Sequence, residues 1–367
     1  MKKTQPIRIG IVGTGSQAKV HAQSFAAIEG VTLAVCHDII EERAKSFATT
    51  CKVGKAVGTL DDLLNDCDLI AIATPDASHS SIALAALAAG KHVLCEKPLT
   101  VTMDEAIQLA QAARRAGGRG QHHAVNFSKR NAPAIQRAIE IVRSGQLGEI
   151  RHVHGSYLQA WLASRYLGPW SDAWLHWRLC TDMGSGGTLA DLGVHLLDYA
   201  TAIAGEVRAL RCTLRTYPKL IADGSMVTHH EGHALDANDT ALIELDLANG
   251  GLASLHTSRW GTGIGNSERL DVHGTEGALS LDLGQAGDRL RTCLGNDRHR
   301  NAWTTYEGLP PVLNVQQRLI AAIRGGPPAE PDLLRGVDVQ AMLTACMRSA
   351  QTGAWETPTD RQASVSK

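Results

Sequence analysis

Residues 7–18 read Ile-Arg-Ile-Gly-Ile-Val-Gly-Thr-Gly-Ser-Gln-Ala, and this stretch decides the fold of the first third of the chain. Its first six residues form an apolar run of the kind found in buried parallel strands. They lead into Gly13-Thr14-Gly15-Ser16-Gln17-Ala18, a G-x-G-x-x-A turn that opens a helix expected over Gln17 to Ala27. The first glycine permits a tight turn, the second lets the backbone approach a pyrophosphate, and the small last residue allows close helix–strand packing. The turn therefore predicts a dinucleotide cradle with phosphate charge at the helix N-terminus.

An acidic residue follows the turn at the distance such a cradle requires. The second strand, expected over Val31 to Cys36, ends close to Asp38, about twenty residues further along the chain. An aspartate there accepts hydrogen bonds from both hydroxyls of the adenosine ribose and repels a 2′-phosphate. Ile39 and Ile40 follow in place of a phosphate-binding arginine, so we expect NAD rather than NADP. The same carboxylate can also cap the next helix, and the two roles are compatible.

Strands and helices continue to alternate as far as residue 125. The expected elements are Leu60 to Asn65, Leu69 to Ala73, Ser78 to Ala89, Lys91 to Cys95, Met103 to Ala116 and Gln121 to Val125. This order predicts an α/β Rossmann domain over residues 1–125, with a parallel sheet and ligands beyond the carboxyl ends of its strands. The expected cofactor-binding residues are Gly13, Thr14, Gly15, Ser16, Gln17, Ala18, Asp38, Ala73, Thr74, Pro75, His79, Glu96 and Lys97.

Glu96-Lys97-Pro98 stands at the end of one of these strands. Pro98 restrains Lys97 to an extended conformation, and the bond between them can be cis. A lysine held near the nicotinamide would polarise or deprotonate a substrate hydroxyl. The alternative is an ordinary solvated lysine at a strand end.

A second stretch with ionisable groups is Gly186-Gly187-Thr188-Leu189-Ala190-Asp191-Leu192-Gly193-Val194-His195-Leu196-Leu197-Asp198. After its glycines it reads as a helix that places Asp191, His195 and Asp198 on one face. The surrounding aliphatic residues indicate that this face lines a cleft rather than a solvated surface. A carboxylate one turn before a histidine fixes the tautomer of the imidazole, which suits proton transfer near neutral pH.

Taken together, the three motifs resemble the glucose-fructose oxidoreductase, inositol dehydrogenase and rhizopine-catabolism (Gfo/Idh/MocA) family, over Ile7 to about Trp355. The resemblance implies a Rossmann domain followed by an α+β domain with a large, mostly antiparallel sheet. It further implies oxidation of sugars or cyclitols with NAD or NADP, and a catalytic group consisting of Lys97, Asp191 and His195. The chain departs from the family after the last Rossmann strand. Members often carry a glycine–aromatic pair before an arginine there, whereas residues 125–130 of this chain read Val-Asn-Phe-Ser-Lys-Arg. Asn126 and Arg130 are treated as cleft residues.

Residues 126–367 are expected to form the substrate-binding and oligomerisation domain. Helices are expected over Ala134 to Arg143, Leu313 to Ile323 and Val337 to Ala350. The expected strands are Ile150 to Ala160, Leu210 to Tyr217, Thr240 to Leu247, Leu252 to Trp260, Arg269 to His273, Ala278 to Leu283 and Arg289 to Leu294. Glycine-rich turns between several of them predict consecutive hairpins. One face of the sheet would pack on helices, and the other would join copies of the chain into a homodimer or homotetramer.

Four of the seven tryptophans lie between Trp161 and Arg178. Aromatic faces suit the apolar faces of sugar rings, but packing against the sheet explains the segment equally well. The substrate-binding residues expected here are Trp174 and Arg178, in addition to Lys97, Asn126, Asp191 and His195. The cluster 229–233 reads His-His-Glu-Gly-His, and with Asp223-Gly224 it is expected to lie in a loop. It lacks the spacing of a zinc-binding helix, so no metal is expected.

Composition limits the classes of partner. The chain has 36 basic and 37 acidic residues, so no strong field favours nucleic acid or an anionic membrane. Eight scattered cysteines and the absence of a long apolar run favour a cytoplasmic protein without a membrane span. The function expected is NAD-dependent oxidation of a hydroxyl on a sugar, sugar derivative or cyclitol. The alternatives are a redox-neutral glycoside-processing enzyme with tightly held NAD and a non-catalytic dinucleotide-binding regulator.

Overall fold

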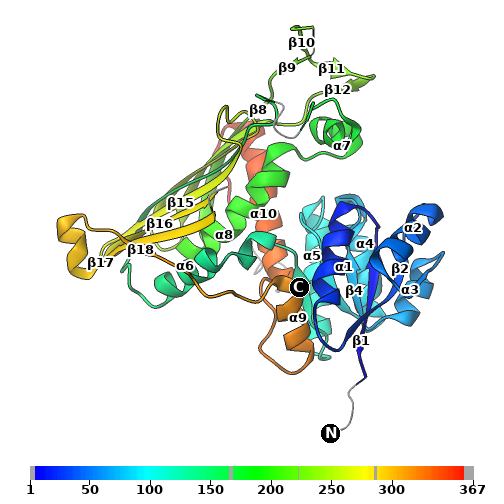
Figure 1. Ribbon diagram of the computed structural model, residues 1–367. Coiled ribbons are helices and arrows are strands. Elements are labelled where there is room, and N and C mark those ends of the chain that lie inside the picture. Colours follow the sequence, from blue (N-terminus) through cyan, green and yellow to red (C-terminus); the bar gives the residue numbers. More distant parts are fainter. Residues whose placement is uncertain (1–4, 165–167, 222, 285–286, 359–367) are drawn as a thin grey trace. The chain divides into compact units, whose positions relative to one another are not determined.

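Two compact units make up the chain in the computed structural model, which describes residues 5–164, 168–221, 223–284 and 287–358 (Figure 1). The first unit combines Met1–Asn131 with Leu313–Gln340, and the second combines Ala132–Val312 with Ala341–Lys367. The chain is therefore not divided into 1–125 and 126–367 as expected, because a late segment returns to the first unit.

Apolar packing explains the return of this segment. Its helix α9 (Val315–Ile323) begins with a capping box formed by Asn314 and Gln317. The buried side chains of Leu319 and Ile320 join the same core cluster as Phe25 of the first helix. A helix whose apolar stripe matches the surface of the first unit is most stable there, wherever it stands in the sequence.

A six-stranded parallel sheet forms the centre of the first unit, in the order β3-β2-β1-β4-β5-β6. Its strands are β1 (Ile7–Val12), β2 (Val31–His37), β3 (Lys55–Ala56), β4 (Leu69–Ile72), β5 (His92–Cys95) and β6 (His123–Val125). The chain order reverses beside β1, which creates the crevice where such sheets bind ligands. The Rossmann architecture expected from the sequence is confirmed, and only the two-residue β3 was not foreseen.

Helices flank this sheet at the expected places. They are α1 (Ser16–Ala26), α2 (Glu41–Cys51), α3 (Leu60–Asp66), α4 (His79–Ala88) and α5 (Met103–Gly117), with short 3₁₀ helices at Asp76–Ser78 and Ser128–Asn131. Local signals fix where several of them begin. Thr59 caps α3, and Thr102 and Glu105 form a capping box at α5.

The second unit is built on an eight-stranded sheet in the order β18-β17-β16-β15-β7-β14-β13-β8. Its strands are β7 (Ile150–Gln159), β8 (Val207–Arg215), β13 (Thr240–Leu247), β14 (Leu252–Ser258), β15 (Asn266–Gly274), β16 (Gly277–Gly284), β17 (Gly287–Leu294) and β18 (Thr304–Tyr306). All neighbours are antiparallel except β14 and β7, which run parallel. The large, mostly antiparallel sheet is confirmed.

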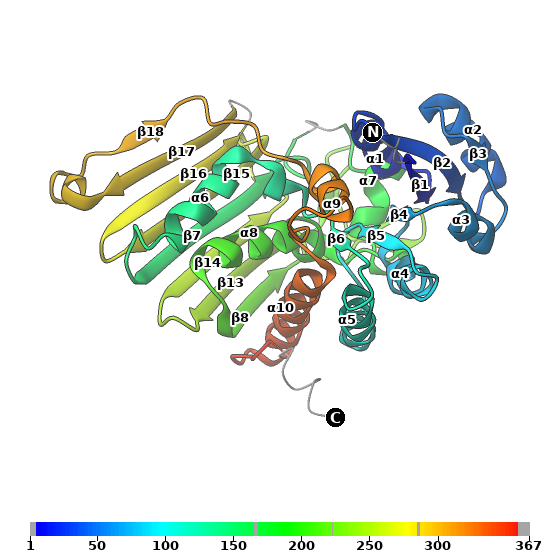
Figure 2. The same cartoon turned by 90° about the horizontal axis from the view of Figure 1, so that it is seen from below.

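Helices cover one face of this sheet (Figure 2). They are α6 (Pro133–Arg143) and α8 (Val194–Ala204). The helix α10 (Leu333–Thr352) begins in the first unit and ends in the second, where its Ser349 hydroxyl oxygen accepts the Cys212 N–H of β8 at 2.9 Å, and a 3₁₀ turn at Gly295–Arg300 follows β17. Nearly every residue of α8 is buried, which matches its mostly apolar composition on all sides. The side chains of β13 are alternately buried and more exposed along the strand, so the more exposed ones lie on the opposite face of the sheet.

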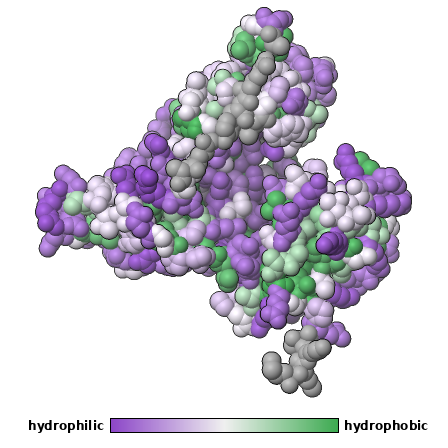
Figure 3. Space-filling view, viewed as in Figure 1, coloured by the Kyte–Doolittle hydropathy of each residue, from purple (hydrophilic) through white to green (hydrophobic). Residues whose placement is uncertain are grey.

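An excursion between β8 and β13 extends from the end of the sheet (Figure 3). It contains two short ladders, β9 (Lys219–Leu220) with β10 (Met226–Val227) and β11 (His229–His230) with β12 (His233–Ala234). The sequence predicted a loop here. Leu220 and Met226, which face each other across β9 and β10, expose about half of their surface.

All eight cysteines are free thiols. Among the described residues, no helix combines the length and the apolar character needed to cross a bilayer.

Candidate active site

The glycine turn after β1 has the geometry of a phosphate cradle. Gly13 has a φ of +78°, and a Cβ there would lie 2.7 Å from the carbonyl oxygen of Ala73. Gly15 precedes α1 in open space, and none of the described side chains caps that helix. The N–H groups of its first turn can therefore bind an anion, and the turn fits the pyrophosphate of a dinucleotide. The structure brings together all six expected turn residues, which are Gly13, Thr14, Gly15, Ser16, Gln17 and Ala18.

Asp38 lies just beyond β2 and faces the same turn. Its Oδ2 accepts hydrogen bonds from the Thr14 backbone N–H at 2.9 Å and the Thr14 hydroxyl at 2.7 Å. Its Oδ1 accepts the Ile40 N–H at 3.0 Å. Burial alone would raise the pKa of Asp38, but the bonds from Ile40 and Thr14 hold it below its ordinary value. These bonds occupy three of the roughly four acceptor positions of a carboxylate, so Oδ1 has capacity for a ribose hydroxyl.

The segment after β4 contains Ala73, Thr74 and Pro75, and His79 begins α4 behind it. The His79 ring is buried, with Nδ1 lying 2.8 Å from the Pro98 carbonyl oxygen and Nε2 lying 2.9 Å from the Thr74 carbonyl oxygen. Both ring nitrogens are therefore engaged with backbone groups of the protein. His79 joins the loop after β4 to the loop after β5, which gives it a structural place beside the expected cofactor site.

Glu96 and Lys97 follow β5, and the bond between Lys97 and Pro98 is cis. Glu96 is 6% exposed and accepts from Asn126 Nδ2 at 2.7 Å, while its Oε1 lies 2.9 Å from His21 Nε2. Its other oxygen accepts the Lys97 backbone N–H at 3.2 Å. Burial would raise the pKa of Glu96, but His21, Asn126 and the Lys97 charge hold it below its usual value. Glu96 is therefore an anion that fixes the backbone on which Lys97 stands.

Two further observations concern the same group. His21 Nδ1 meets Gln316 Nε2 of α9 at 2.9 Å, which ties the returning helix to this network. Asn126 Oδ1 is buried and has no hydrogen-bond partner among the described residues. Asn126 was expected to bind substrate from the second domain, but the structure places it in the first unit. Its unsatisfied carbonyl, beside the strand ends, is a feature that a bound ligand would complete.

In the second unit, the turn Gly186-Gly187 is clamped by Asn238. Gly187 has a φ of +70°, and a Cβ there would lie 2.3 Å from Asn238 Nδ2. The Asn238 backbone oxygen accepts the Thr188 N–H at 2.7 Å, and its side-chain oxygen accepts the Leu189 N–H at 3.0 Å. This asparagine caps the start of the helical segment from a position fifty residues away in the sequence.

The helical segment begins as a π turn over Leu189–Gly193 and continues as α8. The sequence predicted an α-helix throughout, so the register of Asp191 relative to His195 differs from the expected i, i+4 geometry. A π turn inserts one residue per turn and is frequent at functional sites. His195 and Asp198 are buried, at 7% and 1% exposure, which agrees with a face directed away from bulk solvent.

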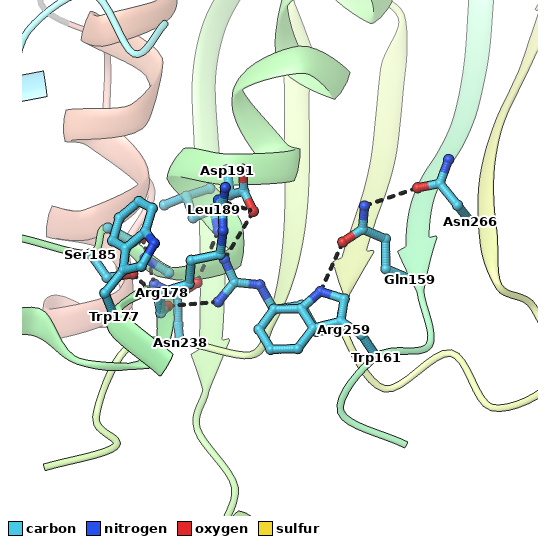
Figure 4. A network of polar contacts seen from close by, with 12 residues as sticks. Gln159, Trp161, Trp177, Arg178, Ser185, Leu189, Asp191, Asn238, Arg259 and Asn266 are labelled. Atoms are coloured by element: carbon cyan, nitrogen blue, oxygen red, sulfur yellow. Dashed lines mark hydrogen bonds and ion pairs between the residues drawn. The ribbon is translucent and has the colours of Figure 1, made fainter. Parts of the chain in front are cut away.

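Asp191 is held by two arginines (Figure 4). Its Oδ2 lies 3.1 Å from Nη2 of Arg259 and 3.3 Å from Nη1 of Arg178. The Arg178 side chain stacks on Trp177, with its guanidinium carbon 4.7 Å from the ring centre. The carboxylate that sequence reasoning paired with a histidine is therefore also the partner of two guanidinium groups.

The tryptophan-rich segment splits into buried and exposed parts. Trp161 and Trp170 belong to a buried cluster of the second unit, whereas Trp174 is 53% exposed. The packing interpretation holds for the first two residues. Trp177 lies against Arg178 and donates its Nε1–H to the Trp174 carbonyl oxygen at 3.1 Å. Residues 165–167 of the segment lie outside the described residues.

The histidines of the excursion pack with this segment. His230 lies edge-on to His176 at 5.0 Å and to Trp170 at 5.1 Å, and His233 Nδ1 contacts Asp182 Oδ2 at 2.7 Å. Across the described parts of the chain, no group of three or more histidine, cysteine, aspartate or glutamate side chains has a geometry that holds a metal ion.

Sequence reasoning missed His21, Gln316, Asn238 and Arg259. His21 stands within α1, eight residues after Gly13, and a buried polar residue on a helix facing the sheet was the only available signal. Arg259 stood inside a run expected to be a strand, and it directly follows β14. Nothing in the local sequence connects it to Asp191, because their contact spans 68 positions.

A Rossmann unit with a glycine phosphate cradle, followed by a unit built on a large, mostly antiparallel sheet, is the architecture of a dinucleotide-dependent oxidoreductase. Family models agree over both units. Residues 7–123 match the oxidoreductase family with an NAD-binding Rossmann fold, and residues 135–280 match the GFO/IDH/MocA C-terminal domain. The chain belongs to the Gfo/Idh/MocA family, and its cofactor is NAD.

Known members of the family match over nearly the whole chain. Levoglucosan dehydrogenase of Pseudarthrobacter phenanthrenivorans is 27% identical and covers 96% of this chain and 98% of its own. D-glucoside 3-dehydrogenase of Escherichia coli is 26% identical over 95% of this chain and 97% of its own. A solved levoglucosan dehydrogenase in complex with NADH and levoglucosan has a TM-score of 0.82 at 25% identity, covering 96% of this chain and 99% of its own. These relatives are sugar dehydrogenases, in keeping with an oxidoreductase.

Proposed function

We propose that the protein is an NAD-dependent dehydrogenase that oxidises a hydroxyl of a sugar, sugar derivative or cyclitol. The observation that carries the proposal is the placement of Asp191 and the buried His195 on adjoining turns of one helical segment, in a chain that also has Lys97 on a backbone fixed by Glu96. An Asp–His pair and a lysine are the groups needed to remove and stabilise a proton. Relatives named for oxidation of levoglucosan and glucosides support the substrate class.

When bound, NAD supplies the hydride acceptor. In the proposed mechanism, His195, oriented by Asp191, removes the hydroxyl proton. Lys97 donates a hydrogen bond to the same oxygen and stabilises the developing alkoxide.

The preference for NAD over NADP is proposed from Asp38. Its carboxylate is held by Thr14 and Ile40 in a fixed position, with capacity left at Oδ1 for a ribose hydroxyl. A 2′-phosphate at the same place would meet a negative charge with no arginine directly after it.

The proposed sugar contacts are Trp174 and Arg178, together with Asn126 and the catalytic group. Trp174 offers an exposed aromatic face, and Arg178 is half-buried against Trp177 with its charge close to Asp191. Aromatic faces bind the apolar faces of sugar rings, while guanidinium and amide groups bind hydroxyls.

The test is NADH absorbance with purified protein, NAD or NADP, and a panel of monosaccharides, anhydrosugars, inositols and glycosides. We expect turnover with NAD. We also expect Lys97→Ala and His195→Ala to lose kcat by orders of magnitude while calorimetry shows that NAD still binds. Near-normal turnover in either variant would contradict the mechanism. NAD binding without NADH release would favour the redox-neutral enzyme if a glycoside is consumed, and the regulator if none is.

We further propose that copies of the chain join through the outer face of the eight-stranded sheet, as a homodimer or homotetramer. Leu242 and Leu252 expose 51% and 58% of their surface there, on the neighbouring strands β13 and β14. Ion pairs between Arg208 and Asp246 and between Arg269 and Asp282 present both signs of charge on the same face. A second copy of such a face is complementary in charge and buries the exposed leucines.

A further inference from the structure

Arg259 carries a guanidinium that is completely buried, and Figure 4 shows the residues that it contacts. Its Nη1 donates to the Arg178 carbonyl oxygen at 2.9 Å, and its Nη2 donates to Asp191 Oδ2 at 3.1 Å. The guanidinium carbon lies 5.0 Å from the ring centre of Trp161. Trp161 is itself fixed, because its Nε1 donates to Gln159 Oε1 at 2.9 Å. Both terminal nitrogens of Arg259 and one face of its guanidinium are therefore held by groups of the same unit, while its buried Nε has no hydrogen-bond partner among the described residues.

A second buried pair lies behind this arginine. Lys219 Nζ contacts Asp239 Oδ2 at 2.6 Å, and neither side chain has any exposed surface. The backbone N–H of Arg259 donates to the Asp239 carbonyl oxygen at 3.0 Å. The Lys219–Asp239 pair and the group of Arg259, Asp191 and Arg178 are thus joined through the backbone of Arg259, and among these side chains only Asp191 and Arg178 are partly exposed. Asp191 is the accessible carboxylate paired with the buried arginine.

The pairing with Arg259 restricts what Asp191 can do. Burial lowers the pKa of Arg259, and the Asp191 carboxylate opposes that shift. An arginine nevertheless stays protonated, and a buried cation that loses its counter-ion is strongly unfavourable. Protonation of Asp191 would leave Arg259 in that state. A carboxylate paired in this way keeps its negative charge and its orientation, and it accepts hydrogen bonds without taking the proton.

We propose that Arg259 is a positioning residue for the reaction, which fixes the charge and orientation of Asp191. The inference rests on the proposed function. Asp191 then acts as a permanent anion that orients the imidazole of His195 or the substrate hydroxyl, and the proton moves to His195. Arg178 shares the same oxygen of Asp191 from the more exposed side and reinforces the charge.

The test compares Arg259→Lys and Arg259→Met with the parent across pH. Arg259→Met removes the paired charge, so Asp191 takes a proton more readily, and we expect the acid limb of kcat/KM to move up by about one pH unit or more. We expect kcat to fall roughly tenfold to a hundredfold, with a smaller change in KM, because a misplaced group costs most in the transition state. Arg259→Lys keeps the charge and should restore the position of the acid limb while recovering only part of kcat.

Arg300→Met is the matched control, because Arg300 forms an exposed pair with Asp297 at 2.6 Å, away from Asp191 and outside the strands of the sheet. This variant should keep the parent's dependence of kcat/KM on pH. If Arg259→Met does not fold, the double variant Arg259→Met/Asp191→Asn should fold, because it leaves no unpaired charge at this place. The kinetic test is then made with Arg259→Lys. An active parent whose Arg259 variants lose activity equally at every pH, or lose none, overturns this inference alone. An inactive parent overturns the proposed function and this inference with it.

Discussion

The imidazole of His21 and the carboxylate of Glu96 lie 2.9 Å apart in the interior of the first unit, although 75 positions separate them in the sequence. His21 has no exposed surface, and Glu96 also receives the amide of Asn126. Through Gln316 the same imidazole reaches α9. The contact therefore joins the glycine-turn helix, the loop that carries Lys97 and the returning helix into one polar network.

Replacing His21 tests the strength of this network. His21→Phe leaves Glu96 and Gln316 with a missing partner in a buried place, which costs about 1–3 kcal/mol of unfolding free energy. His21→Gln retains a hydrogen-bonding side chain and should recover part of the loss. Urea unfolding followed by fluorescence measures both. Parent-like stability of His21→Phe would show that the network contributes nothing.

The pH dependence of stability should reveal the charge of Glu96. Its pKa in the folded protein is lowered, chiefly because His21 and Asn126 outweigh the effect of burial. A depressed pKa stabilises the fold above the unfolded value of about 4.3 and loses that contribution as the pH falls below it. The difference in Tm between the parent and Glu96→Gln should therefore shrink as the pH is lowered from about 5 through this range. A constant difference would mean that Glu96 is not ionised in the fold.

Asp38→Asn tests cofactor selection. The amide keeps the shape of the carboxylate but removes the charge that opposes a 2′-phosphate and weakens the bond to a ribose hydroxyl. We expect NAD affinity to fall by roughly tenfold and discrimination against NADP to relax, since hydrogen bonds to charged groups contribute about 1.5–3 kcal/mol. Calorimetric titration with both cofactors measures the ratio. Glu41→Gln, an exposed acid on the next helix, serves as the control and should leave the ratio unchanged.

Alanine substitutions at two glycines can distinguish the cost of steric crowding from the cost of backbone strain. Gly187 and Gly184 both have positive φ, at +70° and +90°, but only Gly187 faces a neighbour, with Asn238 Nδ2 2.3 Å from the position of a Cβ. Alanine at either position costs roughly 1 kcal/mol through strain. Gly187→Ala should cost clearly more and should lower kcat, because Asn238 holds the start of the segment with Asp191. If thermal unfolding shows the same loss of stability for Gly187→Ala and Gly184→Ala, crowding against Asn238 contributes nothing.

Assembly through the outer face of the sheet can be tested by placing charged residues on that face. Leu242→Lys together with Leu252→Glu should reduce the mass measured by light scattering from that of a dimer or tetramer to that of a monomer. Leu313→Lys, which alters an equally exposed leucine outside the sheet, should leave the mass unchanged. A monomeric parent would contradict assembly through this face.

The sequence by itself determined the parts of the protein that local rules govern. The alternation of apolar runs with helical patterns fixed the parallel sheet, because each strand and helix must bury its own apolar face. The glycines of the turn after β1 and the hairpin turns of the second unit were readable because only glycine adopts those backbone conformations without strain. The positions of Asp38, Lys97, Asp191 and His195 at strand ends or on one helical segment followed from the same patterns.

Only the tertiary structure decided which groups hold these residues in place. Gln316 meets His21 across 295 positions, and Arg259 meets Asp191 across 68. No periodicity encodes such contacts, since they depend on how separate elements pack and on which buried charges must find partners. The π turn at Leu189–Gly193 was also not predictable from the sequence, because its residues fit the pattern of an ordinary α-helix. The hydrogen bond from Leu189 to Asn238, at the start of this turn, is a tertiary contact.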